Sequence, residues 1–138
     1  MIEQTTDLEA CHRIRREVFI IEQSVPEAEE LDGLDGHALH LLARDADGQP
    51  VGTARILLKA DTGKIGRVAV LRAARGTGLG AALIRAALQE LRQQPGITRA
   101  QLGAQTHAIA FYEKLGFQAY GPEYDDAGIP HRDMARAL

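Results

Sequence analysis

Three glycines alternate with other residues in the stretch Arg75-Gly76-Thr77-Gly78-Leu79-Gly80, and a strongly helical run follows them. Residues 64–71, which precede the stretch, predict a strand, and the apolar residues of about 78–92 lie on one stripe of a helix. Glycine leaves no side chain in the way and lets the backbone turn sharply. Free N–H groups and the dipole make such a helix start an anion site. The sequence therefore predicts a strand, a tight turn and a helix that together bind an anion.

The spacing of this loop narrows the kind of anion. The loop lacks the Lys-Ser/Thr ending of the phosphate-binding loop of ATPases, and it fails the Gly-x-Gly-x-x-Gly spacing of nicotinamide-binding loops. A nicotinamide-binding loop would also follow the first strand of a parallel sheet, whereas a meander comes first here. Arg67, Arg72 and Arg75 suit one local anion. We expect a pyrophosphate other than that of NAD or ATP; the alternative is a plain turn between a strand and a helix.

Periodicity and turn residues place the other elements. Thr6 and Glu9 fit a capping box, and apolar residues at helical spacing predict an amphipathic helix over about 7–20. Short turns at 45–48 and 61–63 predict an antiparallel meander of three strands, 37–43, 51–58 and 64–71. After the helix over 78–92, a strand over 97–103 implies a right-handed parallel crossover. A short helix from Thr106 to Leu115 and strands 117–120 and 129–137 follow. The predicted class is α/β, a mixed, mostly antiparallel central sheet with a parallel βαβ crossover and helices on both faces.

Composition and net charge limit the classes of protein to which the chain can belong. The chain has 138 residues, 45% of them apolar, which predicts one globular domain over residues 1–138. Cys11 is the single cysteine, so no intramolecular disulfide can form, which suits a reducing cytosol. We expect its side chain to be buried. No apolar run approaches the ~20 residues of a membrane helix, residues 1–4 lack the features of a signal peptide, and a net charge of −3 argues against nucleic-acid binding. We expect a cytoplasmic protein that binds neither membranes nor nucleic acid.

Two stretches together resemble the GNAT N-acetyltransferases. Residues 66–70 with the loop 75–80 are similar to motif A of that family, (Gln/Arg)-x-x-Gly-x-(Gly/Ala), and residues 108–117 are similar to motif B. Two motifs in the right order and about thirty residues apart are far more specific than either alone. Residues 18–23, 104–107 and 126–131 also resemble the ElaA/YjcF branch. The resemblance covers nearly the whole chain, implies the acyl-CoA N-acyltransferase fold and places its first strand in residues 1–5.

The resemblance assigns roles in binding acetyl-CoA. The coenzyme would lie in a splay between the strand 64–71 and the strand that ends near Gly103. Main-chain groups of Val68, Ala69 and Val70 would pair with its pantetheine arm, the loop amides would hold its pyrophosphate, and the Gln105 amide would contact the arm. The expected contacts are thus Val68, Ala69, Val70, Arg75, Gly76, Thr77, Gly78, Leu79, Gly80, Gln105, Phe111 and Tyr112. Without the resemblance, the strand residues and Tyr112 are ordinary core, and Gln105 is a polar strand end.

Transfer to an amine sets three chemical requirements. An ammonium with a pKa near ~10.4 must lose its proton, the tetrahedral oxyanion must be stabilised, and the leaving thiolate must be protonated. By resemblance, the Val70 N–H serves the oxyanion and Tyr112 is the general acid. The base is Glu22, His40, His131 or an ordered water. Glu22 ranks first because it follows a helix that should border the acceptor cleft.

Other patterns add less specific signals. Five acidic residues within nine positions are expected to form a solvated, mobile loop, or else to attract a cationic amine; they are Glu27, Glu29, Glu30, Asp32 and Asp35. No His, Cys, Asp or Glu set has the spacing of metal ligands, and no Gly-x-Ser-x-Gly elbow occurs. We therefore expect no metal and no covalent intermediate.

The sequence leaves three functions to compare. The first is an acetyl-CoA-dependent N-acetyltransferase that acts on a primary amine by direct attack in a ternary complex. The second is a non-catalytic acyl-CoA sensor or interaction module on the same fold, and the third is a protein that binds ATP or NAD through the loop. A polyamine, an aminoglycoside-like sugar, a free amino acid and a protein lysine all remain as acceptors. Because relatives often form homodimers, a homodimer is among the expected partners.

Overall fold

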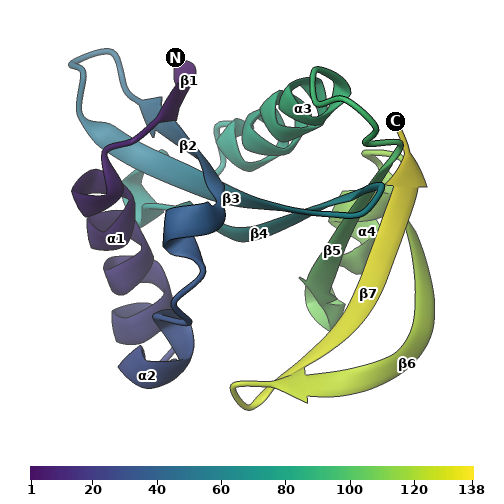
Figure 1. The fold of residues 1–138 in the computed structure, drawn as a ribbon. Helices are drawn as coiled ribbons and strands as arrows, with labels where there is room; N and C mark the ends of the chain where they lie inside the picture. The colour runs from purple at the N-terminus through teal and green to yellow at the C-terminus, as the bar shows by residue number, and fades with distance from the viewer.

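A computed structural model describes all 138 residues and contains one seven-stranded sheet in the order β1-β2-β3-β4-β5-β7-β6 (Figure 1). The strands are β1 (Ile2–Thr5), β2 (Leu39–Arg44), β3 (Pro50–Lys59), β4 (Thr62–Val70), β5 (Arg99–Gln105), β6 (Gln118–Asp126) and β7 (Ile129–Ala137). The helices are α1 (Leu8–Arg15), α2 (Glu27–Glu30), α3 (Leu79–Arg92) and α4 (Ile109–Glu113). Only β4 and β5 pair in parallel. The mixed, mostly antiparallel α/β class predicted from the sequence is confirmed.

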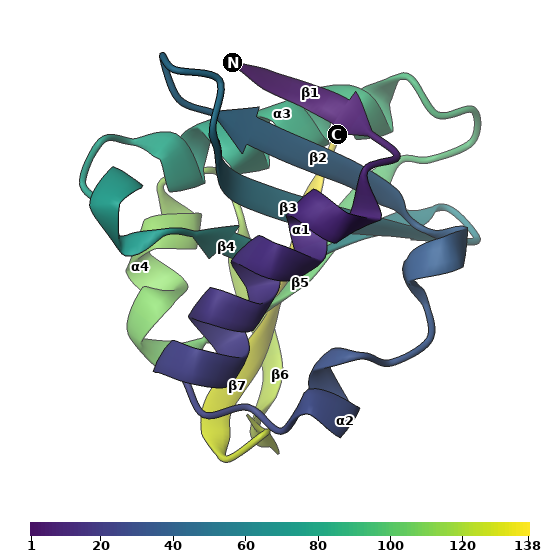
Figure 2. The same ribbon diagram turned by 90° about the vertical axis from the view of Figure 1, so that its left-hand side faces the viewer.

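Helices cover both faces of the sheet. The buried side of α1 packs on Leu42 and Ala69, and Figure 2 looks onto the face where α1 crosses β2, β3 and β4. The alternate residues of the same strands, such as Leu41 and Ile56, point to the other face and pack against α3. Side chains of successive strand residues point to opposite faces, so one stretch of strand supplies both cores. No helix of the chain is both long and apolar enough to cross a bilayer.

The first helix starts and ends differently from the expectation. The side chain that caps α1 belongs to Asp7, which accepts from the Ala10 amide at 3.1 Å, so the predicted Thr6 capping box is wrong by one position. The helix then continues as a π-helical segment, Arg16–Glu22, two residues beyond the expected end. Cys11 is fully buried, as expected. Burial raises the pKa of its thiol.

A bulge and an early end of pairing open the sheet between β4 and β5. The parallel ladder joins only residues 62–64 to residues 99–101, although both strands continue. On the other side of β4 the register with β3 shifts between Thr53 and Arg55, and Arg67 adopts φ = +49°. Such a bulge bends its strand. The second halves of β4 and β5 therefore diverge, as the splay implied by the resemblance requires.

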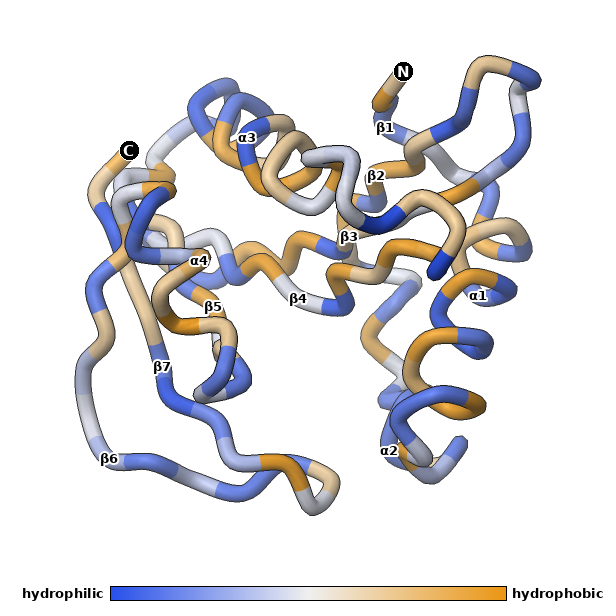
Figure 3. Tube along the Cα trace, turned by 180° about the vertical axis from the view of Figure 1, so that it is seen from behind, coloured by the Kyte–Doolittle hydropathy of each residue, from blue (hydrophilic) through white to orange (hydrophobic).

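The last hairpin is longer than predicted. The expected strand 117–120 is in fact β6, Gln118–Asp126, and its register with β7 shifts between Tyr120 and Tyr124. Gly121 and Pro122 end a strand in most contexts, but an edge strand tolerates them at a bulge. Almost every residue of β6 is exposed, and Figure 3 shows the hydrophilic character of this edge.

Candidate functional site

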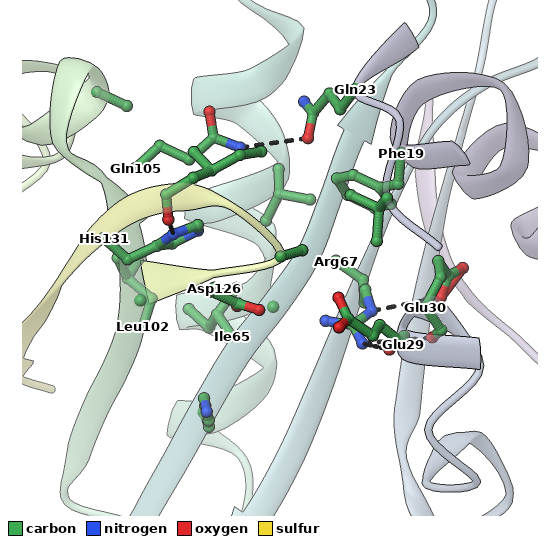
Figure 4. A pocket seen from close by; sticks show the side chains of 18 of the residues that line it. Phe19, Gln23, Glu29, Glu30, Ile65, Arg67, Leu102, Gln105, Asp126 and His131 are labelled. Atoms are coloured by element: carbon green, nitrogen blue, oxygen red, sulfur yellow. Dashed lines mark hydrogen bonds and ion pairs between the residues drawn. The ribbon is translucent and has the colours of Figure 1, made fainter. Parts of the chain in front are cut away.

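A cavity of about 280 Å³ occupies the opening between β4 and β5. Its lining comes from both strands, from the π-helical segment, from the start of the acidic stretch and from the β6–β7 turn. Figure 4 shows Gln105 and His131 on one wall, with Phe19 and Gln23 across from them. Ligand sites are typically concave and apolar with a few convergent polar groups. The opening in the sheet is therefore the candidate site.

The main chain of β4 presents free groups to this opening. The Leu71 amide donates to a β3 carbonyl oxygen at 2.9 Å. Hydrogen-bonded and non-hydrogen-bonded pairs alternate along antiparallel strands, so the Val70 amide points away from β3 and toward β5. Ala69, the neighbouring residue, is turned the other way along the strand. Its main-chain groups face β3, and its side chain is buried beneath α1. Of the three residues expected to act through their main chain, Val68 lines the cavity and Val70 faces the opening, whereas Ala69 does not.

The glycine-rich loop keeps its backbone amides free from Gly76 onward, whereas the expected contact through the Arg75 amide is already used by the Arg72 carbonyl oxygen, at 3.2 Å. Gly76 and Gly78 have φ values of +79° and +83°, and a Cβ at either would meet nothing within 4 Å. Gly78 caps α3 without a side-chain hydrogen bond, and no amide of residues 76–81 donates a hydrogen bond within the protein. Unpaired N–H groups at the start of a long helix favour an anion. The loop thus has the open donors and the unobstructed shape of a phosphate cradle.

The other loop residues fix its position. The Thr77 hydroxyl donates to the Ala74 carbonyl oxygen at 2.6 Å, and Leu79 packs against the main core. A Cβ at Gly80 would lie 3.7 Å from the ring of Phe111, so the start of α3 closely approaches α4. The expected coenzyme-contacting residues of the loop and of α4 are therefore neighbours in space.

Arg75 and Glu22 bridge the loop and the end of the π-helical segment. Arg75 donates to the Val70 carbonyl oxygen at 2.9 Å and to the Glu22 carboxylate at 2.8 Å. A terminal nitrogen of Arg72 lies 3.7 Å from the other Glu22 oxygen. The hydrogen bond from Arg75 lowers the pKa of Glu22 despite some desolvation. A carboxylate held by two guanidinium groups is a weak proton acceptor, so this geometry favours a positioning role for Glu22 over that of a base.

Tyr112 lines the cavity from α4. Its ring meets Phe111 edge-on at 5.0 Å and Phe117 at 6.2 Å between centroids. Its hydroxyl makes no hydrogen bond within the protein, and burial raises its pKa above the ordinary value of 10.0. The phenol is therefore protonated at neutral pH, which is the form that a general acid needs.

Gln105 is the last residue of β5, beyond the part of the strand that pairs with β4. Its amide nitrogen donates to the Gln23 side-chain oxygen at 3.2 Å, across the cavity, and its own oxygen lies 2.6 Å from Nε2 of His107. Each end of this amide has one protein partner and keeps a second N–H or a second lone pair. Gln105 can therefore contact the pantetheine arm, as the resemblance implies, without losing either partner.

The two histidines considered as bases lie in different surroundings. His40 is buried on β2, outside the cavity, with Nε2 2.9 Å from the Asp35 carbonyl oxygen. His131 lines the cavity from β7 and has Nδ1 2.8 Å from the Ile129 carbonyl oxygen. The structure thus brings His131 and Tyr112 to one cavity and leaves His40 in the interior.

The acidic stretch is not a free, solvated loop, so that expectation is wrong, whereas Glu29 of the stretch does lie exposed at the cavity. Glu30 forms two hydrogen bonds with Arg15, of 2.8 and 2.7 Å, and the side chains are 2% and 1% exposed. Asp32 forms two more with Arg55, both of 2.9 Å. Asp35 accepts from Arg15 at 2.9 Å, and desolvation of its carboxylate is outweighed by this and other hydrogen bonds, so its pKa falls well below the usual range. Three of the five acids thus fold the stretch onto the sheet.

The arginines of this network were missed by sequence reasoning. Arg15 interrupts the apolar stripe of its helix four residues after Cys11, and an arginine on a buried face is a signal that a carboxylate must meet it. Arg67, expected beside an external anion, instead reaches Glu30 at 3.4 Å and Asp32 at 3.3 Å. No sequence signal identified these partners, because they lie far apart along the chain.

Comparisons with known proteins agree with this geometry. Residues 3–138 match the acetyltransferase (GNAT) domain family. A Bacillus subtilis protein, the N-acetyltransferase YjcF, is 38% identical over 124 residues, which cover 89% of this chain and 87% of YjcF. The crystal structure of an acyl-CoA N-acyltransferase from Pseudomonas aeruginosa matches with a TM-score of 0.87 and 38% identity, covering 99% of this chain and 97% of that one. Escherichia coli ElaA matches with a TM-score of 0.85 and 33% identity over 99% of both chains. The chain is therefore an acetyltransferase and belongs to the GNAT family, as its two sequence motifs indicated.

Proposed function

We propose that this acetyltransferase uses acetyl-CoA as its co-substrate and moves the acetyl group to a primary amine by direct attack in a ternary complex. The observation that carries the proposal is a set of free donors beside the opening in the sheet. The amides of residues 76–81 and the Val70 amide have no acceptor in the protein, and the cavity between β4 and β5 is lined by Tyr112. A diphosphate, an amide-containing arm and a thioester all need such donors.

The residues present fit the coenzyme. The loop amides would hold the pyrophosphate, since nothing lies within 4 Å of a Cβ at Gly76 or Gly78 and a diphosphate can approach the backbone there. The open edge of β4 would bind the pantetheine arm as a strand binds its neighbour. The Val70 amide would then face the thioester oxygen and stabilise the oxyanion. Arg75 would hold the Val70 carbonyl in place, with Glu22 fixing Arg75 in turn.

The acceptor would enter from the opposite end of the same cavity. Glu29 and Asp126 line it with carboxylates that carry no ion pair, and both are exposed. Such groups attract a cation. A primary amine, which is an ammonium in solution, suits this end better than a hydroxyl or thiol acceptor.

Thiol release tests the proposal. The protein is incubated with acetyl-CoA and a panel of primary amines, and free CoA thiol is measured. We expect amine-dependent release, and Tyr112→Phe should lower kcat by roughly 10²–10⁴-fold, the usual contribution of a general acid, with acetyl-CoA affinity unchanged. Tyr120→Phe is the matched control, because its hydroxyl lies on the exposed hairpin, 3.0 Å from the Gln101 amide.

Thiol release and thermal unfolding together separate the alternative functions. Tight acetyl-CoA binding with no release for any amine, and no effect of Tyr112→Phe, would support a non-catalytic sensor. Stabilisation by ATP or NAD rather than by CoA in thermal unfolding would support a nucleotide-binding protein; a ligand at 100 times its Kd stabilises by about 2.7 kcal/mol.

A further inference from the structure

His131 is held in one orientation at the wall of the cavity. It lies on β7 directly opposite Gln105, the last residue of β5, in the antiparallel register. Its ring stacks on Tyr124 with centroids 5.9 Å apart and planes 23° from parallel. Figure 4 shows its imidazole beside Gln105. Because the ring is fixed by a stack and a hydrogen bond, its free edge has a defined direction.

The hydrogen bond also fixes which ring nitrogen carries the proton. Nδ1 of His131 lies 2.8 Å from the Ile129 carbonyl oxygen. A carbonyl oxygen only accepts, so Nδ1 must donate, and the neutral ring then has its lone pair on Nε2. Nε2 of His131 has no hydrogen-bond partner in the protein. This nitrogen is therefore free to accept a proton.

The two other side chains considered as the general base already have partners in the protein. Glu22 is bound by two arginines, and His40 donates or accepts inside the fold, away from the cavity. The carboxylates of Glu29 and Asp126 do line the cavity, but a carboxylate is a weaker base than imidazole, whose ordinary pKa lies closest to neutral pH. Among the residues that line the cavity, His131 is the one imidazole, the side chain used most often as a general base, and its Nε2 lone pair is free.

We propose that Nε2 of His131 is the general base that deprotonates the acceptor amine, an inference that rests on the proposed function. The ammonium gives one proton to Nε2, which passes it to solvent. The free amine attacks the thioester carbon, so that a C–N bond forms and the C–S bond breaks. The sulfur takes the Tyr112 proton, and the second nitrogen proton restores the Tyr112 hydroxyl. The products are the amide, CoA thiol and one released proton, and no oxidant or metal is needed.

His131→Asn tests this step, because the asparagine amide can still donate to the Ile129 carbonyl oxygen but has nothing at the position of Nε2. Two probe acceptors are used at pH 7: the α-amine of glycylglycine, with a pKa near ~7.7–8.0, and the ε-amine of N-acetyl-lysine, near ~10.4. At this pH roughly a tenth of the first, but fewer than about one in 10³ of the second, is already neutral. His37→Asn is the control, because His37 is an exposed histidine outside the cavity.

If His131 is the general base, His131→Asn lowers kcat/KM by different factors for the two amines. We expect His131→Asn to slow the ε-amine by about 10²-fold or more and the α-amine by about tenfold or less, with acetyl-CoA affinity unchanged and added imidazole restoring part of the rate. Equal losses for both amines, or a loss of acetyl-CoA binding, would show a structural role. Unchanged rates would remove His131 from the reaction. If the wild-type protein binds acetyl-CoA and acetylates neither amine nor any other of the panel, the proposed function fails and the base with it.

The ring protonation is checked without turnover. Nitrogen NMR of the 15N-histidine-labelled protein should show the Nδ1–H form of His131, assigned by its absence in His131→Asn, and acetyl-CoA should shift its Nε2 signal. The Nε2–H form would overturn the proposal even if the enzyme is active.

Discussion

At Gly78 the backbone has φ = +83°, a Cβ there would meet nothing within 4 Å, and the amides on either side of it have no acceptor in the protein. Gly78→Val would place a branched side chain where the phosphate must lie. We expect acetyl-CoA affinity to fall by about 100-fold or more, which corresponds to ~2.7 kcal/mol. Isothermal titration of acetyl-CoA measures this loss.

A control variant must separate the backbone strain caused by a valine at φ > 0° from the obstruction of the phosphate position by its side chain. Gly96, in the turn that follows the C-terminal end of α3, has φ = +77° and also has nothing within 4 Å of a Cβ. Gly96→Val therefore carries a similar backbone cost, of order 1–3 kcal/mol, at the opposite end of the helix from the loop. We expect it to lower stability and to leave acetyl-CoA affinity unchanged. Equal affinity in the two variants would remove the loop from the binding site.

Single residues were predictable where their role is local. Alternating glycines before a helical run specify a turn and free amides regardless of the rest of the chain, and that part of the site followed from the sequence. The orientation of the Val70 amide needed the register with β3, and the surroundings of Glu22 needed Arg75, which is 53 positions away. Pairings of that kind depend on the folded topology, so no spacing in the sequence reveals them.

At the scale of elements, α2 and the residues after it are fixed by buried ion pairs. Breaking a buried pair leaves an uncompensated charge, which typically costs about 3–5 kcal/mol. Glu30→Gln should therefore destabilise the protein by about 3 kcal/mol, at the lower end because Asp35 still contacts Arg15. Urea unfolding at neutral pH measures the loss.

An exposed pair on the same stretch provides the control. Glu27 meets Arg16 at 3.1 Å, but both side chains are more than half exposed. Glu27→Gln should change stability by no more than about 0.5 kcal/mol. If the two glutamines have equally small effects, the acidic stretch is not held by its buried pair.

The elements themselves were largely predictable, and the exceptions have physical causes. Helix α3 and the β2–β4 meander follow from periodicity and turn residues. The acidic stretch was misjudged because charge density indicates solvation unless cations from other elements meet it, and here Arg15, Arg55 and Arg67 do. Strand β6 was predicted too short because its bulge contains Gly121 and Pro122, and the partner strand that tolerates them is not visible in the local sequence.

On the scale of the whole molecule, the opening divides the sheet into two parts, β1–β4 and β5–β7–β6. They are joined by the short pairing of residues 62–64 with 99–101 and by the core that α3 shares with both. The right-handed crossover made β4 and β5 neighbours predictable. Their divergence was implied only by the resemblance, because it arises from the bulge at Arg67, which no periodicity marks.

A ligand that lies along β4 in this opening should act as a further strand and change exchange at defined amides. The amides of Val70 and of residues 76–81 have no protein acceptor and should exchange rapidly with deuterium in the free protein. Saturating acetyl-CoA should slow them by about tenfold or more, whereas the Leu71 amide, already bonded to β3, should change little. Uniform slowing at Val70 and Leu71 would indicate general stabilisation instead. Protection at residues 76–81 without Val70 would mean that the loop binds the diphosphate but the arm does not follow β4, and the placement of the thioester beside Tyr112 would then be wrong.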